Sequence, residues 1–245
     1  MEEKESRFLR VLREHFSAPR IAYMAIFTAL AYVVTFLEFA IFPGVPLANQ
    51  LKFDFANLFF IIEGFIFGPV EALVSIAIKE ALCLLDSSTA GVGEVANLIM
   101  SAAYVILPAI AYRFRKGKWW VVLYLALACV IQIGVSLIVN RYINFPFFGA
   151  MGFLGSMDAA EAFRSIWGYV LAFNAIKSVG ISIVVFVIYK PLSRFIKITS
   201  DKFEKRMHRA KAQPAANGAV QSAEVTPAAG SRSVAAADDP DAGRE

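Results

Sequence analysis

The sequence predicts an all-α integral membrane protein with six transmembrane helices and cytoplasmic N and C termini. Three observations lead to this fold class. Of the 245 residues, 58% are hydrophobic and only 18% are charged, whereas soluble domains average about 45–50% and about 25%. The apolar residues form long blocks, which is typical of helices in lipid. Lys and Arg gather at the ends of these blocks, as they do where they set membrane topology.

The same composition excludes several classes of function. The only two cysteines, Cys83 and Cys129, lie in apolar runs, so we expect neither a disulfide scaffold nor a Cys-rich metal site. The only histidines, His15 and His208, lie in polar end segments, which excludes a histidine-based centre in the apolar body. We expect no nucleic-acid partner, because the basic residues are explained by topology. No G-x-x-x-x-G-K-[ST] phosphate loop occurs, so energy for any transport comes from a partner or an ion gradient.

The first half of the chain contains three predicted helices. The block Ile21–Phe42 has about 22 residues and is long enough to span a bilayer. After the polar stretch Pro43–Asp54, the block Phe55–Leu85 is interrupted by Gly68-Pro69. Its two parts, of about 13 and 16 residues, would be ~20 and ~24 Å long, shorter than the ~30 Å of hydrocarbon. They form either two short spans or a re-entrant hairpin.

The second half contains three more predicted helices, separated by polar segments. The three helices are the blocks Val95–Tyr112, Trp119–Ile143 and Ser165–Tyr189. The polar segments that precede them are a small loop Asp86–Gly93, a basic cluster Arg113–Lys118 and a Gly-rich segment Asn144–Phe163, respectively. We expect residues 144–163 to form a long outer loop, because loops of this length are usually functional or disordered. Such a loop would close over a site as a lid.

The distribution of Lys and Arg predicts the orientation. Five lie before the first block, four between Arg113 and Lys118, and eight between Lys190 and Lys211, whereas the opposite side has Lys52, Arg141 and Arg164. The positive-inside rule therefore predicts a cytoplasmic charged segment 1–20, a membrane domain 21–192 and a basic juxtamembrane segment 193–212. Residues 213–245 are rich in Ala, Pro, Gly and Ser and are predicted to be disordered.

Two polar residues in the last helix form the first candidate site. Asn174 and Lys177 lie three residues apart and so share a helix face. An amide and an ammonium together can hydrogen-bond the carbonyl and imide edge of a heterocycle. The alternatives are a helix–helix contact for Asn174 and a Lys177 side chain that extends to the membrane surface. The central position of Lys177 favours a site.

Glu94 and Asn97 form a second candidate at the start of the fourth helix. Glu94 lies in the first turn, where the helix dipole favours an acid, so it is either a capping residue or a ligand group. Asn97 lies three residues further on and is more consistent with a ligand group. Asn140, near the outer end of the fifth helix, is either interfacial or a site residue.

The interrupted block Phe55–Leu85 contains three further charged residues, Glu63, Lys79 and Glu80. Buried Lys79 needs an acid, and we expect Glu63 on the neighbouring antiparallel segment to supply it. The alternative is that Glu63, Lys79 and Glu80 form the proton relay of an ion-driven secondary transporter. A third possibility is an intramembrane enzyme with Glu94 or Glu80 as the acid/base.

The first helix carries a pair of small residues, Ala25 and Ala29. This small-xxx-small spacing lets another helix approach closely. The partner is either a separate subunit or another helix of the same chain.

Six pieces of the sequence carry a resemblance to a known family. They are Ala25-x-x-x-Ala29, Leu51–Phe55, Gly64–Pro69, Gly91–Asn97, Asn140 with Pro146, and Phe173–Lys177. In this order and spacing they resemble the riboflavin-specific substrate-binding S component of energy-coupling-factor (ECF) transporters, over most of Ile21–Leu192. The resemblance implies a plasma-membrane subunit, not an enzyme, that captures riboflavin from outside without a cofactor or metal. A transmembrane T component and two cytoplasmic ATPases would power transport, and Ala25 and Ala29 would face the T component.

The resemblance also implies roles for individual residues. Asn140, Asn174 and Lys177 would hydrogen-bond the isoalloxazine ring. The ribityl chain would lie near the Leu51 backbone, Glu94 and Asn97. Aromatic side chains that could pack on the ring are Phe53, Phe145, Trp167 and Tyr169. Asn57 and Phe59 depart from the family pattern, where Asp and Pro are usual, so FMN or another vitamin is the alternative ligand.

Overall fold

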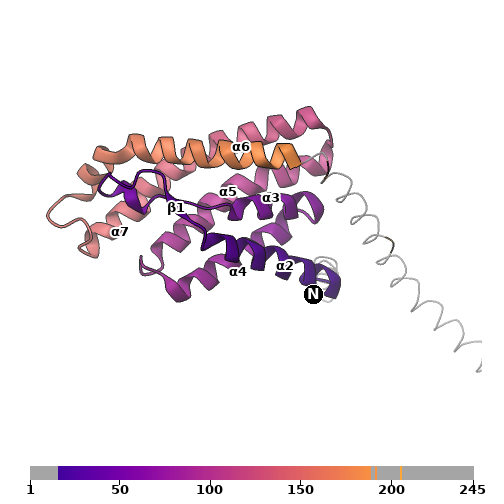
Figure 1. Ribbon diagram of the computed structural model, residues 1–245, viewed down its shortest axis with the longest axis horizontal. Coiled ribbons are helices and arrows are strands. Elements are labelled where there is room, and N and C mark those ends of the chain that lie inside the picture. The colour runs from indigo at the N-terminus through magenta and orange to yellow at the C-terminus, as the bar shows by residue number, and fades with distance from the viewer. Residues whose placement is uncertain (1–15, 189–190, 192–204, 206–245) are drawn as a thin grey trace, which may run out of the picture. The chain divides into compact units, whose positions relative to one another are not determined.

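Most of the described backbone is helical, as expected where lipid offers no hydrogen-bond partners. The computed structural model describes residues 16–188, 191 and 205, and in this part six helical segments are present (Figure 1). They are α2 (Ala18–Thr35), α3 (Ala56–Ile66), α4 (Pro69–Cys83), α5 (Val92–Phe114), α6 (Lys118–Val139) with its continuation to Ala150, and the helix Ala159–Ile188. The predicted six helices are confirmed. The segments 1–15, 193–212 (except 205) and 213–245 lie outside the described residues.

Four of the six helices are long and apolar enough to cross a membrane. They are Ala18–Thr35, Val92–Phe114, Lys118–Ala150 and Ala159–Ile188. In contrast, α3 has 11 residues and α4 has 15. At about 1.5 Å per residue these helices are roughly 17 and 23 Å long, shorter than the ~30 Å of hydrocarbon. The block 55–85 is therefore a pair of short helices.

The turn between α3 and α4 occurs where the Gly68-Pro69 pair predicted it. Gly68 has φ 120° and ψ −179°, a conformation that side chains with a Cβ rarely adopt. Pro69 begins α4, where a missing N–H costs no helical hydrogen bond. The Arg113 guanidinium lies beside Gly68 and donates to the Phe67 carbonyl at 3.5 Å. This turn is thus fixed by backbone geometry and by a contact from α5.

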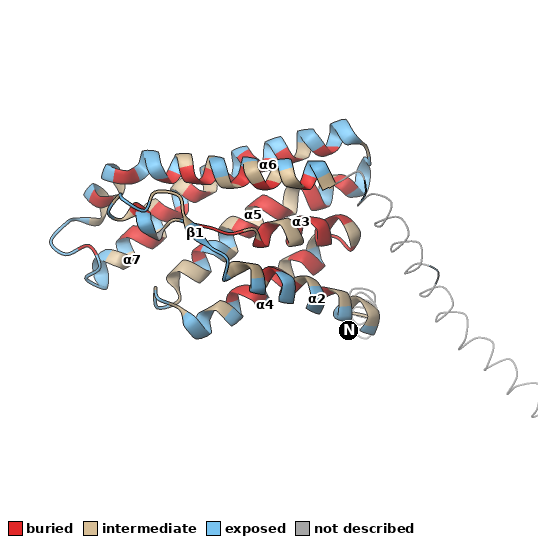
Figure 2. Cartoon of the chain, in the orientation of Figure 1, coloured by how far each residue is buried: buried red, intermediate tan, exposed pale blue. Residues whose placement is uncertain are grey.

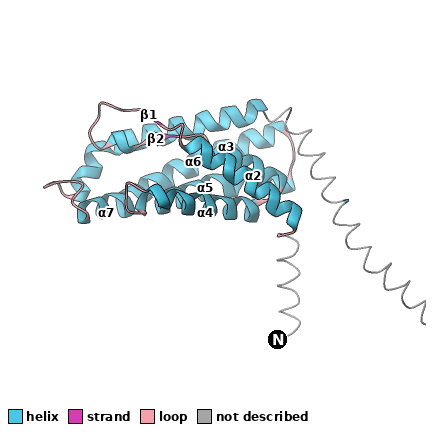
Figure 3. Cartoon of the chain, turned by 60° about the horizontal axis from the view of Figure 1, so that its bottom comes forward, coloured by secondary structure: helices cyan, strands magenta, loops and turns pink. Residues whose placement is uncertain are grey.

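The polar stretch between α2 and α3 is held against the helices by a small β-ribbon (Figure 3). Strands β1 (Phe39–Ala40) and β2 (Lys52–Phe53) pair antiparallel, with Phe39 opposite Phe53, and a 3-10 turn η1 (Ala48–Gln50) lies between them. The two phenyl rings stack with centroids 5.3 Å apart. Phe53 is only 5% exposed and packs in the main apolar core. The ribbon therefore brings this loop into the interior.

The predicted long loop at 144–163 is wrong at both ends. Helix α6 continues through a π-helical turn, Asn140–Asn144, into α7 (Phe145–Ala150), and only residues 151–158 form turns before the next helix. Pro146 is tolerated because it lies in the first turn of α7, where its fixed φ suits a helix. Phe145 is buried in a second apolar cluster with Leu154 and Ile166. The aromatic residues of this segment therefore belong partly to the core.

Apolar side chains from the helices meet in two clusters. The main cluster includes Phe60 from α3, Ile76 from α4 and Tyr104 from α5. Buried residues line the inward faces of the helices, and α3 is buried over most of its surface (Figure 2). Leu51 packs against both clusters. Helix α3 thus lies among the other helices, whereas α4 keeps an exposed face, and the loop before them lies at the junction of the clusters.

We expect Gly64→Ala to destabilise the protein because α3 and α5 approach closely there. A Cβ at Gly64 would lie 2.7 Å from the Ala109 Cβ, and such overpacking costs about 1–3 kcal/mol. Gly134 on α6 has nothing within 4 Å of its Cβ position, so Gly134→Ala should stabilise by about 0.5–1 kcal/mol. Thermal unfolding in detergent measures both. Adding Ala109→Gly should recover stability in Gly64→Ala, and no recovery would contradict the close approach.

Candidate functional site

Four polar side chains form a buried row along α6 and its π-helical end. Gln132, Ser136, Asn140 and Asn144 are spaced by four residues and are 4%, 0%, 5% and 8% exposed, respectively. Residues four apart lie on one helix face. Of these, sequence reasoning singled out only Asn140. The repeated spacing of four was the signal that would have found the other three.

Within this row, neighbouring side chains hold the Asn140 amide in place. Asn140 Nδ2 donates to the Ser136 carbonyl at 2.8 Å, and Asn144 Nδ2 donates to Asn140 Oδ1 at 3.1 Å. Asn140 is therefore buried inside the protein, and its role as a site residue stays a prediction.

Asn174 faces this row from the 159–188 helix. It is 3% exposed. Its Nδ2 donates to the Val170 carbonyl at 2.9 Å, and its Oδ1 accepts from Gln132 Nε2 at 3.5 Å. The structure thus joins the two helices through a Gln–Asn pair, of which the sequence indicated only the Asn.

Lys177 forms an ion pair with Asp54, one helical turn from Asn174. The Lys177 Nζ lies 2.6 Å from Asp54 Oδ2, and both side chains are 12% exposed. Asp54 Oδ1 also accepts from the Ala56 N–H at 2.8 Å, which satisfies a free donor at the start of α3. Lys177 is therefore paired inside the protein rather than extended to the surface. Asp54 was not singled out from the sequence, although a buried lysine implies a nearby acid.

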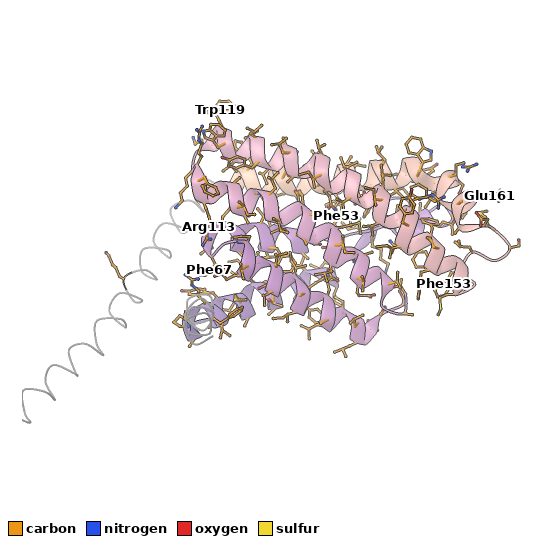
Figure 4. All side chains as sticks on the ribbon, turned by 180° about the vertical axis from the view of Figure 1, so that it is seen from behind. Phe53, Phe67, Arg113, Trp119, Phe153 and Glu161 are labelled. Carbon is orange, nitrogen blue, oxygen red and sulfur yellow. The ribbon has the colours of Figure 1, made fainter. Side chains whose placement is uncertain are left out.

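Leu51 lies three residues before Asp54 and is partly buried between the two apolar clusters. Of the aromatic candidates, Phe53 and Phe145 are buried, whereas Trp167 and Tyr169 are 51% and 40% exposed. Figure 4 shows Phe53 midway along the helices. Trp167 borders a hollow of about 250 Å³ that is lined by Leu137, Ile138, Arg141, Tyr142, Phe163 and Trp167.

Glu94 holds the turn that precedes α5. Its Oε2 accepts from Ser87 Oγ at 2.9 Å and from Thr89 Oγ1 at 3.1 Å. Ser87 Oγ in turn accepts from the Gly91 N–H at 2.9 Å. Asn97 is exposed on α5. Among the described residues, neither side chain is hydrogen-bonded to Asn140, Asn174 or Lys177, so their assignment as ligand groups stays a prediction.

The expected pairing of Glu63 with Lys79 is wrong. Glu63 Oε1 accepts from Ser75 Oγ at 2.7 Å, and Lys79 Nζ lies 3.0 Å from Glu80 Oε1. The register of the two helices explains this result. Because α3 and α4 run antiparallel from the turn at Gly68, Glu63 is level with about residue 72, and Lys79 lies roughly 10 Å beyond it.

The site therefore combines oriented amides with one paired cation, and it can recognise a polar, uncharged edge. Among the described residues, no three His, Cys, Asp or Glu side chains lie close enough together to hold a metal ion. The contacts suit hydrogen bonding to a ligand rather than nucleophilic chemistry, which needs a nucleophile with an adjacent base.

Comparison with known proteins identifies the family. A protein-family model described as "ECF transporter, substrate-specific component" matches residues 19–189. The chain belongs to this family. The resemblance found in the sequence is thus confirmed, and it extends over all six helices. Membership implies a membrane protein with a substrate-binding rather than a catalytic role.

Individual relatives of this S component agree with that assignment. The chain is 28% identical over 179 residues to the riboflavin transporter RibU of Staphylococcus aureus (strain TCH60), covering 73% of this chain and 92% of the relative. It is 25% identical over 181 residues to the riboflavin transporter FmnP of Bacillus subtilis (strain 168), covering 73% and 94%. A solved structure of the S component of a bacterial ECF transporter superimposes with a TM-score of 0.62 at 27% identity, covering 74% and 99%.

We expect the Asp54–Lys177 pair to contribute strongly to stability. Asp54→Ala would leave a partly buried ammonium without its partner, a change that typically costs about 3–5 kcal/mol. Asp158→Ala is the matched control, because Asp158 Oδ2 accepts from the Ala160 N–H at 2.8 Å in the same way but forms no ion pair among the described residues. Thermal unfolding in detergent compares the two. Adding Lys177→Met to Asp54→Ala should restore part of the lost stability. Equal losses of stability in Asp54→Ala and Asp158→Ala would contradict the importance of the pair.

Proposed function

We propose that the protein is the riboflavin-capturing subunit of an ECF-type importer. It would bind riboflavin at the extracellular side and deliver it through an ATP-driven module formed by a T component and two ATPases. The observation that carries this proposal is the grouping of Asn174 and Lys177 with Gln132 and Asp54 in a buried polar region. This group occurs in a chain whose relatives include proteins named riboflavin transporters.

The isoalloxazine ring would lie between α6 and the 159–188 helix. Its carbonyl and imide edge offers both acceptors and a donor, which matches amide and ammonium side chains. Asn140, Asn174 and Lys177 are the proposed hydrogen-bonding residues. Lys177 would have to share or exchange its contact with Asp54 when the ring binds. Leu51, through its backbone, and Glu94 and Asn97 are the proposed neighbours of the ribityl chain.

The proposed orientation places both termini and the 113–118 loop in the cytoplasm of a cell whose plasma membrane holds the protein. Arg113 and Trp119 lie at one end of the helices, and Phe153 and Glu161 lie at the opposite end (Figure 4). The positive-inside rule assigns the basic end to the cytoplasm. The 151–158 turn would then face outside, at the same end as the proposed ligand entry. Segments 1–20, 193–212 and 213–245 would be cytoplasmic.

Helix α2 is the proposed contact with the T component. Ala25 and Ala29 are exposed, and exposed Ile26 and Leu30 adjoin them in sequence. Small residues in such a face let a partner helix approach closely. This exposure favours a separate subunit over another described helix of the same chain as the partner.

We expect the purified protein, alone in detergent, to bind riboflavin and to show quenching of Trp fluorescence. Asn174→Ala and Lys177→Ala should each weaken binding by at least tenfold, because each removes a partner from a buried polar edge. Fluorescence titration measures the dissociation constant. The double variant Asp54→Ala/Lys177→Met removes the Lys177 contact without leaving an unpaired charge. Weak binding by this variant therefore reports loss of the ligand contact rather than loss of the fold. A colourless preparation without quenching would remove riboflavin as the ligand, and unchanged affinity in both single variants would remove this site.

We expect Ala25→Trp or Ala29→Trp to block assembly with the T component and ATPases while riboflavin binding is retained. An indole at either position would prevent close helix approach. Ala126→Trp, at an exposed alanine on α6, is the control and should assemble normally. Co-purification of the tagged complex measures assembly. Loss of riboflavin binding in the α2 variants would show instead that these alanines pack within the subunit.

A further inference from the structure

The orientation of the Gln132 amide follows from a backbone carbonyl. The Val170 carbonyl can only accept, so Asn174 must direct its Nδ2 toward it, at 2.9 Å. This orientation turns Asn174 Oδ1 toward Gln132, at 3.5 Å. Because Oδ1 also only accepts, Gln132 must present Nε2 there. The Oε1 atom of Gln132 is therefore the one left over for another contact.

This leftover oxygen is buried and unpaired within the described chain. Gln132 is 4% exposed, and its Oε1 has no hydrogen-bond partner among the described residues. Buried polar atoms are nearly always hydrogen-bonded. On the buried face of α6 its neighbours are Cys129, a weak donor, and Ser136, whose hydroxyl already donates to the Ile133 carbonyl at 2.8 Å. A ligand with an N–H or O–H group is the partner that this position calls for.

The groups around this oxygen define the chemistry of that ligand. Gln132 Nε2 and Asn174 Nδ2 each retain a second N–H, and Lys177 lies one turn along the same helix face as Asn174. An acceptor flanked by donors matches a cyclic imide, in which one N–H lies between two carbonyls. An anionic group would be repelled by the bare carbonyl oxygen. The arrangement therefore favours the imide edge of a planar heterocycle.

We propose that Gln132 is a ligand-binding residue and that its Oε1 accepts the imide N–H of the bound flavin. Asn174 then has a second role as a positioning residue, because it fixes the orientation of the Gln132 amide. This inference rests on the proposed riboflavin binding and adds the residue that recognises the one donor on that edge of the ring.

The test is a comparison of riboflavin with riboflavin methylated at the imide nitrogen. Methylation removes the donated hydrogen, so the wild-type protein should bind the methylated flavin at least tenfold more weakly. Gln132→Met keeps the length of the side chain but removes the acceptor. It should bind riboflavin about tenfold more weakly than the wild type and bind the two flavins with nearly equal affinity. Fluorescence titration gives the four dissociation constants.

Asn144→Leu is the matched control. Asn144 is also a buried amide whose Oδ1 is unpaired among the described residues, but it lies twelve positions along the row, roughly 18 Å away. Whatever its own affinity for riboflavin, Asn144→Leu should retain the full penalty for methylation.

Two outcomes would overturn the assignment of Gln132. One is equal binding of both flavins by the wild type, a measurement that needs no variant. The other is a methylation penalty that persists in Gln132→Met, because a purely steric effect would persist there. Failure of the wild type to bind either flavin would instead overturn the proposed function.

Discussion

The ion pair between Asp54 and Lys177 is the contact on which much of this architecture depends. A lysine near the middle of the 159–188 helix is costly in lipid unless an acid reaches it, and the acid comes from a loop. That loop must therefore fold in among the helices, which the β1–β2 ribbon and buried Phe53 achieve. Because Asp54 also holds the first turn of α3, α3 begins level with Lys177, near the middle of the 159–188 helix. Its short length follows from that starting point.

Most of the fold was predictable because helices in lipid are encoded locally. Apolar blocks gave the six helices, and Gly68-Pro69 gave the turn between the short ones. Prediction failed where the local signal had two readings. The Gly, Asn and Pro residues of 144–163 indicated a loop, but Pro146 falls in the first turn of a helix. The Glu63–Lys79 pairing failed because it depends on the register across the turn at Gly68, which spacing along one helix does not give.

The candidate site was predictable only in part, for a related reason. Asn174 and Lys177 were found because their spacing of three places them on one face. Gln132 and Asn144 were missed although they share the spacing of four with Ser136 and Asn140. Asp54 was beyond prediction as a partner, because it lies 123 positions from Lys177 in the sequence. The orientation of the amides depends on carbonyls such as that of Val170, and no sequence pattern reports it.

The π-helical turn at Asn140–Asn144 gives this chain a place where its length can change without unfolding a helix. Hydrogen bonds in such a turn span one residue more than in an α-helix, so a single inserted or deleted residue is absorbed within one turn. The helical segments on either side keep their own hydrogen bonds. Because the change is absorbed within the turn, α7 and the 151–158 turn keep their orientation relative to α6, and Gln132 and Ser136 stay in position. The chain beyond this turn can thus change in length while Gln132 and Ser136, the half of the buried polar row that precedes it, stay in place.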